Sequence, residues 1–149
     1  MNNTESMAMW KLYLSSNEGI AIQTTYRRLM NSFNNVEDQI NIGVMKYINY
    51  DHETFSMLNM DNWFMHKRSC FEYEHKIRCL THKFPENWKD EPLINEGISI
   101  SINPNELIEN IYCSPDSPKW FLDLVKITIS NFGKSYICRE SSLAIKPTY

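Results

Sequence analysis

The sequence has little glycine and no long apolar run, and both absences exclude classes of protein. Only four of its 149 residues are glycine. The segment "SSNEG" at residues 15–19 lacks the glycines and the lysine of a phosphate-binding loop. No apolar segment approaches the roughly 20 residues that span a bilayer, and the start "MNNTESMAMWKLYL" has no basic region followed by an apolar stretch. We therefore expect a cytoplasmic protein with no signal peptide and no membrane partner.

Clustered cysteines and a strong excess of one charge are also missing. The cysteines at positions 70, 79, 113 and 138 form no CxxC pair, which predicts reduced thiols. A net charge of −3 gives no strong signal for nucleic acid. The composition, 42% hydrophobic and 22% charged, is typical of a globular chain. Its length fits a single domain, 1–149, with a core of its own.

Hydrophobic periodicity predicts helices and strands without a regular βαβ rhythm, which indicates an α+β fold. We expect a mixed, mostly antiparallel sheet with a few packed helices. The predicted helices cover residues 5–16, 26–33 and 118–132, with helical turns at 62–68 and 104–110. The predicted strands cover residues 19–25, 40–50, 71–83, 97–103, 111–114 and 135–141, and a surface loop covers 84–96.

Capping residues mark two of the helices. Thr4 or Asn3 is expected to cap the first helix, and Gly19 to stop it. For the helix at 118–132, Ser117 is the expected N-cap, Pro118 the first helical residue and Gly133 the stop. Its predicted core-facing stripe consists of Phe121, Leu124, Val125, Thr128 and Phe132.

The segment "HKRSCFEYEHKIRCLTHK", residues 66–83, concentrates ionisable side chains. On a strand that includes residues 71–79, one face is nearly apolar and the opposite face carries Glu72, Glu74, Lys76 and Arg78. One interpretation is a solvated sheet surface with weak charge pairs. The other is a cleft in which Glu72 and Glu74 are catalytic and Arg78 holds an anion. A helical reading, which groups Phe71 with Glu74, His75 and Arg78, fits the pattern less well.

A metal site in the same segment is not expected. Cys70 and His82 share one strand face, whereas His75 and Cys79 point to the other. Their spacing also matches no zinc finger. His75 is better explained as a core histidine.

Several blocks of the chain, taken in order, resemble a known family. They are "AMWKLYLSSNEGIAIQTTYRRL", "IGVMKYINYD", "HKRSCFEYEHKIR", "LIENIYCSPDSPKWFLDLV" and "CRESSL". Together they resemble the domain of unknown function 2971 family of bacterial proteins, from Ala8 to Leu143. The family pattern covers Trp10, Tyr13, Gly19, Lys67, Phe71, Glu72, Glu74, Arg78, Ser114, Pro115 and Trp120. The resemblance implies an α+β fold and no settled activity.

The resemblance also implies that this chain lacks the N-terminal portion that family members usually have. Members usually carry a sizeable N-terminal part that includes a strand with a basic residue, whereas Met1 stands here almost at the start of the shared block. We therefore expect this chain to be the C-terminal part of a longer architecture, and any site that needs both parts to be inactive in it.

Two functional hypotheses follow. In the first, the Glu-x-Glu pattern is similar to that of ADP-ribosyltransferases, so the chain handles a nucleotide or NAD. Glu74 then holds a ribose hydroxyl and stabilises an oxocarbenium ion, Glu72 assists an acceptor, and Arg78, Lys67, Trp10 and Tyr13 bind the ligand. In the second, the chain is a non-catalytic protein-interaction module, for example in a defence or stress locus. An exposed aromatic patch would then bind a protein partner.

Overall fold

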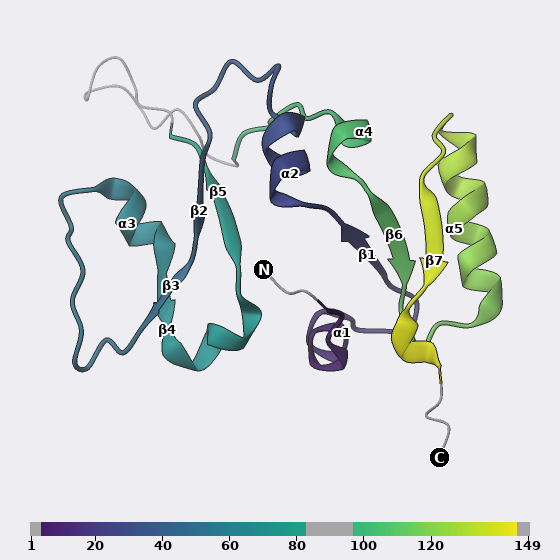
Figure 1. Ribbon diagram of the computed structural model, residues 1–149, viewed down its shortest axis with the longest axis horizontal. Helices are drawn as coiled ribbons and strands as arrows, with labels where there is room; N and C mark the ends of the chain where they lie inside the picture. Colours follow the sequence, from purple (N-terminus) through teal and green to yellow (C-terminus); the bar gives the residue numbers. More distant parts are fainter. Residues whose placement is uncertain (1–3, 83–96, 146–149) are drawn as a thin grey trace. The chain divides into compact units, whose positions relative to one another are not determined.

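The computed structural model describes residues 4–82 and 97–145 (Figure 1). These residues divide into two compact units. The first contains residues 35–82 and 97–101, and the second contains residues 4–34 and 102–145. The second unit is therefore built from both ends of the described chain, and the first unit is the segment between them. The single-domain organisation stays a prediction.

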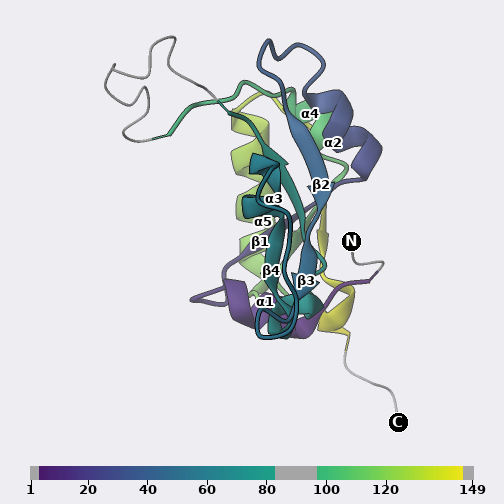
Figure 2. The same ribbon diagram turned by 90° about the vertical axis from the view of Figure 1, so that its left-hand side faces the viewer.

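The first unit contains short strands and helices in two small strand pairs. Strand β2 (Asn41–Val44) pairs antiparallel with β5 (Ile77–Leu80), and both views show them side by side (Figures 1 and 2). Strand β3 (Lys46–Ile48) pairs parallel with β4 (His66–Arg68). The remaining elements are helix α3 (Met60–Met65) and the 3₁₀ helix η1 (Ser69–Glu74).

Met45 is the point at which the chain passes from one strand pair to the other. The strand predicted over residues 40–50 is divided there into β2 and β3, which have different partners. The Met45 N–H donates to the Lys76 carbonyl oxygen at 2.9 Å. The residue is only 3% exposed. A buried side chain and a main-chain bond therefore fix the junction between the two pairs.

The strand predicted over residues 71–83 is confirmed in β5 and wrong over residues 71–74, which belong to η1. His75 ends η1 with φ 44° and ψ 48°, the left-handed region, and so turns the chain toward β5. A 3₁₀ helix has three residues per turn, so Phe71 and Glu74 lie on the same side. Glu72 and Glu74 therefore do not share a face, as the strand interpretation required.

The second unit contains a three-stranded sheet with the order β1-β6-β7 among the described residues. Strand β1 (Ile20–Gln23) is antiparallel to β6 (Asn110–Cys113), which is parallel to β7 (Ile137–Glu140). Helix α5 (Lys119–Asn131) lies beside β7 (Figure 1). The other elements are α1 (Met7–Tyr13), α2 (Tyr26–Ser32), α4 (Pro104–Leu107) and the 3₁₀ helix η2 (Ser142–Ala144).

Helix α1 is shorter than predicted, and its caps differ. The Ser6 hydroxyl oxygen, and not that of Thr4, accepts from the Met9 N–H, at 3.4 Å, and the other predicted cap, Asn3, lies outside the described residues. The helix ends at Leu14 in an extended conformation, so Gly19 is not its stop. Gly19 is buried just before β1, and a Cβ there would clash with the Leu14 side chain. A larger residue at position 19 would therefore require the Leu14 side chain to shift.

Helix α5 confirms its predicted end and corrects its predicted start. Gly133 has φ +66°, and its N–H donates to the Ser130 carbonyl oxygen at 2.8 Å, which closes the helix. Pro118 occupies the N-cap position, one residue later than expected. The Ser117 hydroxyl donates instead to the Ser114 carbonyl oxygen.

The predicted core-facing stripe of α5 is wrong in part. Phe121 and Val125 are half-buried, but Leu124, Thr128 and Phe132 are exposed. Phe132 is 79% exposed, which excludes a core position within the described chain.

The α+β class is confirmed, because helices accompany sheets that mix antiparallel and parallel pairing. The buried hydrophobic residues of the described chain are few, namely Trp10, Met45, Ile111 and Cys113. Residues 97–103 form no strand, against the prediction, and the loop predicted at 84–96 lies outside the described residues. Of the helices in the described ranges, none combines the length and the apolar character that crossing a bilayer requires.

Candidate functional site

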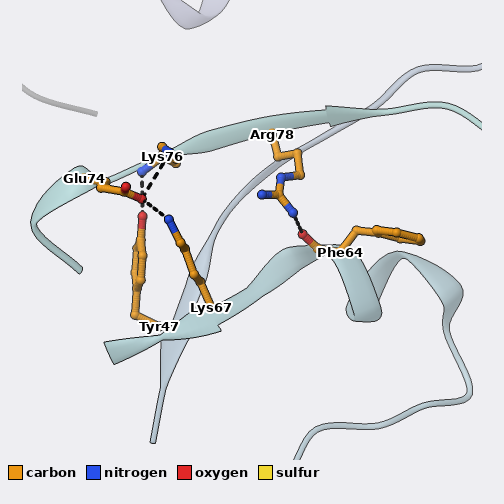
Figure 3. Close-up of polar contacts among 6 residues, drawn as sticks. All are labelled: Tyr47, Phe64, Lys67, Glu74, Lys76 and Arg78. Carbon is orange, nitrogen blue, oxygen red and sulfur yellow. Dashed lines mark hydrogen bonds and ion pairs between the residues drawn. The ribbon is translucent and has the colours of Figure 1, made fainter. Parts of the chain in front are cut away.

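Glu74, at the end of η1, is the most buried charged side chain among the predicted site residues. Its side chain is 4% exposed, and Oε2 lies 2.6 Å from Lys67 Nζ and 3.2 Å from Lys76 Nζ (Figure 3). The Lys67 ammonium also lies 4.1 Å from the centre of the Phe71 ring. Phe71 and Glu74 contact the same lysine because the 3₁₀ spacing places both on one side.

Two residues that the sequence reasoning did not propose complete this cluster. Lys76 contributes its ammonium to Glu74, and its N–H donates to the Tyr47 Oη at 2.9 Å (Figure 3). Lys76 was placed on the ionic face, but its pairing with Glu74 depends on the turn at His75. No local pattern in the sequence connects Tyr47 with this segment. We call Tyr47, Lys67, Glu74 and Lys76 the Glu74 cluster.

Glu72 and Arg78 lie apart from the Glu74 contacts. Glu72 is exposed on η1. The Arg78 guanidinium, on β5, donates to the carbonyl oxygen of Phe64 in the last turn of α3 (Figure 3). That contact satisfies a helix carbonyl, which is a structural use of an arginine. Of the four proposed site residues in this unit, Lys67 and Glu74 are joined by an ion pair.

The arrangement of the Glu74 cluster limits its chemistry. Two ammonium groups contact the same carboxylate oxygen, and together they more than balance its charge. Its charge is therefore engaged in ion pairs with Lys67 and Lys76 inside the unit. The geometry therefore favours a structural role for Glu74.

A second polar contact in the same unit joins α3 to the end of β5. Asp61 Oδ1 lies 2.6 Å from His82 Nε2, and Asp61 Oδ2 accepts from the Asn41 amide at 2.9 Å. Within residues 4–82 and 97–145, no group of three or more His, Cys, Asp or Glu is placed to hold a metal ion. The Asp61 contacts therefore tie elements of the unit together.

Three of the cysteines, Cys79, Cys113 and Cys138, are not activated nucleophiles. All four are free thiols, and Cys113 is fully buried on β6. Burial raises the pKa of the Cys79, Cys113 and Cys138 thiols, and for Cys113 the nearby Cys138 and Glu140 raise it further. These three thiols therefore stay protonated at neutral pH and are poor nucleophiles.

The second unit contains a groove between α1 and β1, which we call the α1–β1 groove. It has a volume of about 740 Å³, and both predicted binding residues of this unit, Trp10 and Tyr13, line it. Its other apolar and aromatic walls come from Met9, Leu14, Ile20, Ile22 and Tyr112. Ile20 and Ile22 are about half exposed, at 47% and 51%. The sequence analysis did not propose either isoleucine as a binding residue, because isoleucine on a predicted strand is normally expected to be buried in the core.

Glu5 lines the α1–β1 groove and is the charged residue among those that line it. Its Oε2 accepts from the N–H and the hydroxyl of Ser142, at 2.9 and 2.7 Å, and its Oε1 accepts from the Trp10 indole N–H at 3.4 Å. Burial opposes ionisation here. However, hydrogen bonds from Ser142, Ser141 and Trp10 together outweigh that effect and lower the pKa of Glu5. The groove therefore carries a negative charge at neutral pH.

Comparison of the chain with protein-family models, curated proteins and solved structures found no match. The geometry of the two regions is therefore the basis for a functional proposal.

Proposed function

We propose that this chain is a non-catalytic protein-interaction module whose α1–β1 groove receives a segment of a partner protein. The observation that carries the proposal is the groove itself, with Tyr13, Ile20 and Ile22 about half exposed along its walls. Its volume of about 740 Å³ lies within the range of ligand-binding clefts. Exposed aromatic and branched side chains around a hollow are typical of binding surfaces.

The charge of the groove favours a peptide over a nucleotide. Glu5 is ionised, and the phosphates of a dinucleotide such as NAD would be repelled by it. A peptide segment carries no such obligatory negative charge. The nucleotide- or NAD-handling hypothesis, with Glu74 as its catalytic residue, stays a prediction. It has less support, because Glu74 is neutralised by Lys67 and Lys76. The resemblance to the domain of unknown function 2971 family also stays a prediction.

The test is a selection for binders, followed by a matched pair of variants. The 149-residue chain is used to select peptides from a random 12-residue phage library, and their affinities are measured by fluorescence polarisation. Tyr13 and Leu12 are equally exposed, at 56% and 55%, but Leu12 does not line the groove. We expect Tyr13→Ala to weaken binding at least tenfold and Leu12→Ala to leave it within twofold.

Two outcomes would overturn the proposal. One is a selection that yields no peptide with a dissociation constant below about 100 µM. The other is a set of peptides that lose affinity equally with Tyr13→Ala and Leu12→Ala. Conversely, NAD⁺ binding that is lost in Glu74→Gln, with an unchanged melting temperature, would support the enzymatic hypothesis instead.

A further inference from the structure

The open edge of β1 presents main-chain hydrogen-bonding groups. Among the described strands, β1 lies at one edge of its sheet. The carbonyl oxygens of Gly19 and Gln23 accept from Ser114 and Glu109, at 2.9 and 3.0 Å, so the odd-numbered residues direct their main chain toward β6. The direction alternates along an antiparallel strand. The N–H and C=O groups of Ile20 and Ile22 therefore point away from β6, toward the open edge.

The α1–β1 groove runs along that same edge. Each residue of β1, from Ile20 to Gln23, lines it, and Met9, Trp10 and Tyr13 of α1 line it as well. Four residues of strand span about 13 Å. Among residues 4–82 and 97–145, the main-chain edge that no strand covers and the space of the groove thus coincide along β1.

We infer that the groove binds its partner by strand addition: an extended segment of another protein pairs with the open edge of β1. The inference rests on the proposed function and specifies its ligand. Main-chain bonds to Ile20 and Ile22 supply affinity, and alternate apolar side chains of the segment contact Tyr13 and the two isoleucines. An exposed strand edge is a ready template for such pairing.

The charge of Glu5 adds a requirement for the segment. The Glu5 hydrogen bonds described above come from neutral donors, namely Ser142 and the Trp10 indole. Its negative charge is therefore not paired by any of them. A lysine or arginine of the segment, placed beside Glu5, supplies the opposite charge. The expected ligand is an extended segment of alternating apolar residues that carries a basic residue.

The main-chain part of the inference is tested with the selected peptides by N-methylation. Methylating a peptide nitrogen removes a hydrogen-bond donor and leaves the side chain in place. Two versions of each peptide are made. One is methylated at the nitrogens of its odd-numbered residues, and the other at the nitrogens of its even-numbered residues. In strand addition only one set of N–H groups faces β1, so one version should lose affinity about tenfold or more and the other should stay within about twofold.

The charge part is tested with Glu5→Gln and a peptide in which norleucine replaces the basic residue. We expect Glu5→Gln to weaken the basic peptide about two- to fivefold and to leave the norleucine peptide unchanged. An equal effect of Glu5→Gln on both peptides would overturn the requirement for a basic residue.

The outcomes separate this inference from the proposed function. If the peptides depend on Tyr13 but the two methylated versions bind equally, the groove is a binding site and strand addition is wrong. If the chain forms a dimer by light scattering and the dimer excludes the peptides, the edge pairs with a second copy and the inference is overturned. If no peptide is selected, the proposed function itself fails.

Discussion

The two units place their charged and apolar side chains in opposite ways. In the first unit a carboxylate, Glu74, is buried at 4% exposure between two lysines. In the second unit apolar side chains, Ile20 and Ile22, stay about half exposed along a groove. The segment with the densest charge in the sequence therefore buries one carboxylate, Glu74, in ion pairs, while Glu72 on the same helix stays exposed. The apolar segment of β1 is less conspicuous in the sequence, but it leaves Ile20 and Ile22 exposed at a groove. The density of charge alone is therefore a poor guide to a binding site.

The largest effect on the free energy of unfolding is expected for Trp10→Ala, which tests whether Trp10 packs as a buried wall of the groove. Trp10 is 9% exposed and is one of the few buried hydrophobic residues of the described chain. Its truncation should lower the free energy of unfolding by about 3 kcal/mol or more, because a large cavity is left. Urea unfolding followed by circular dichroism measures the change. Trp10→Phe, which keeps much of the ring, should cost clearly less; equal costs would mean that Trp10 does not pack as described.

Glu74→Gln tests the structural interpretation of the buried charge. It leaves Lys67 and Lys76 without their counter-charge, but their side chains are 25% and 36% exposed and can gain water. We expect a loss of about 1 to 3 kcal/mol in the free energy of unfolding. Glu72→Gln, at an exposed position of the same helix, is the matched control and should stay within about 0.5 kcal/mol. A Glu74 variant as stable as the Glu72 variant would restore the case for a functional carboxylate.

Glu5→Gln tests the charge of the groove through the pH dependence of stability. Because the folded pKa of Glu5 is lowered, its ionisation stabilises the folded state above the unfolded pKa of about 4.5. That contribution is lost as the pH falls through the folded pKa. Glu5 is partly exposed, so we expect no more than about 1 kcal/mol. Melting temperatures at pH 7 and pH 3 should differ more in the wild type than in Glu5→Gln; parallel curves would contradict the lowered pKa.

The smallest effect on stability is expected at the groove surface. Ile20→Thr and Ile22→Thr replace half-exposed side chains with residues that also favour strands. Each should change the free energy of unfolding by about 0.5 kcal/mol or less. The same variants should weaken the selected peptides severalfold. A loss of stability above about 2 kcal/mol would show that these side chains belong to the core and would remove the contrast between the two units.

The sequence predicts elements well where local signals decide them. Gly133 ends α5 because its left-handed conformation suits glycine, and β7 follows within the predicted strand. The prediction fails where tertiary contacts decide. The alternation at residues 71–74 is typical of a strand, but η1 forms there and brings Phe71 and Glu74 to Lys67.

The same distinction between local signals and tertiary contacts applies to the candidate sites. Lys67 and Glu74 were proposed together and do meet, but the spacing argument placed Glu74 on a strand with Glu72. Trp10 and Tyr13 were proposed from the family resemblance, and both line the groove. Ile20 and Ile22 could not be found, because exposure along an edge depends on which strands pair, and β1 pairs with a strand near residue 110.

The pairing of β1 with β6 has a consequence for the order in which the chain is synthesised. Gln23 and its partner Asn110 are 87 residues apart, whereas the first unit is continuous in sequence between them. A ribosome adds about 5 to 20 residues per second, so β1 waits on the order of 5 to 20 s for β6 to emerge. During that interval both edges of β1 are open. The segment with the apolar Ile20 and Ile22 is therefore open to pairing with other chains throughout that interval.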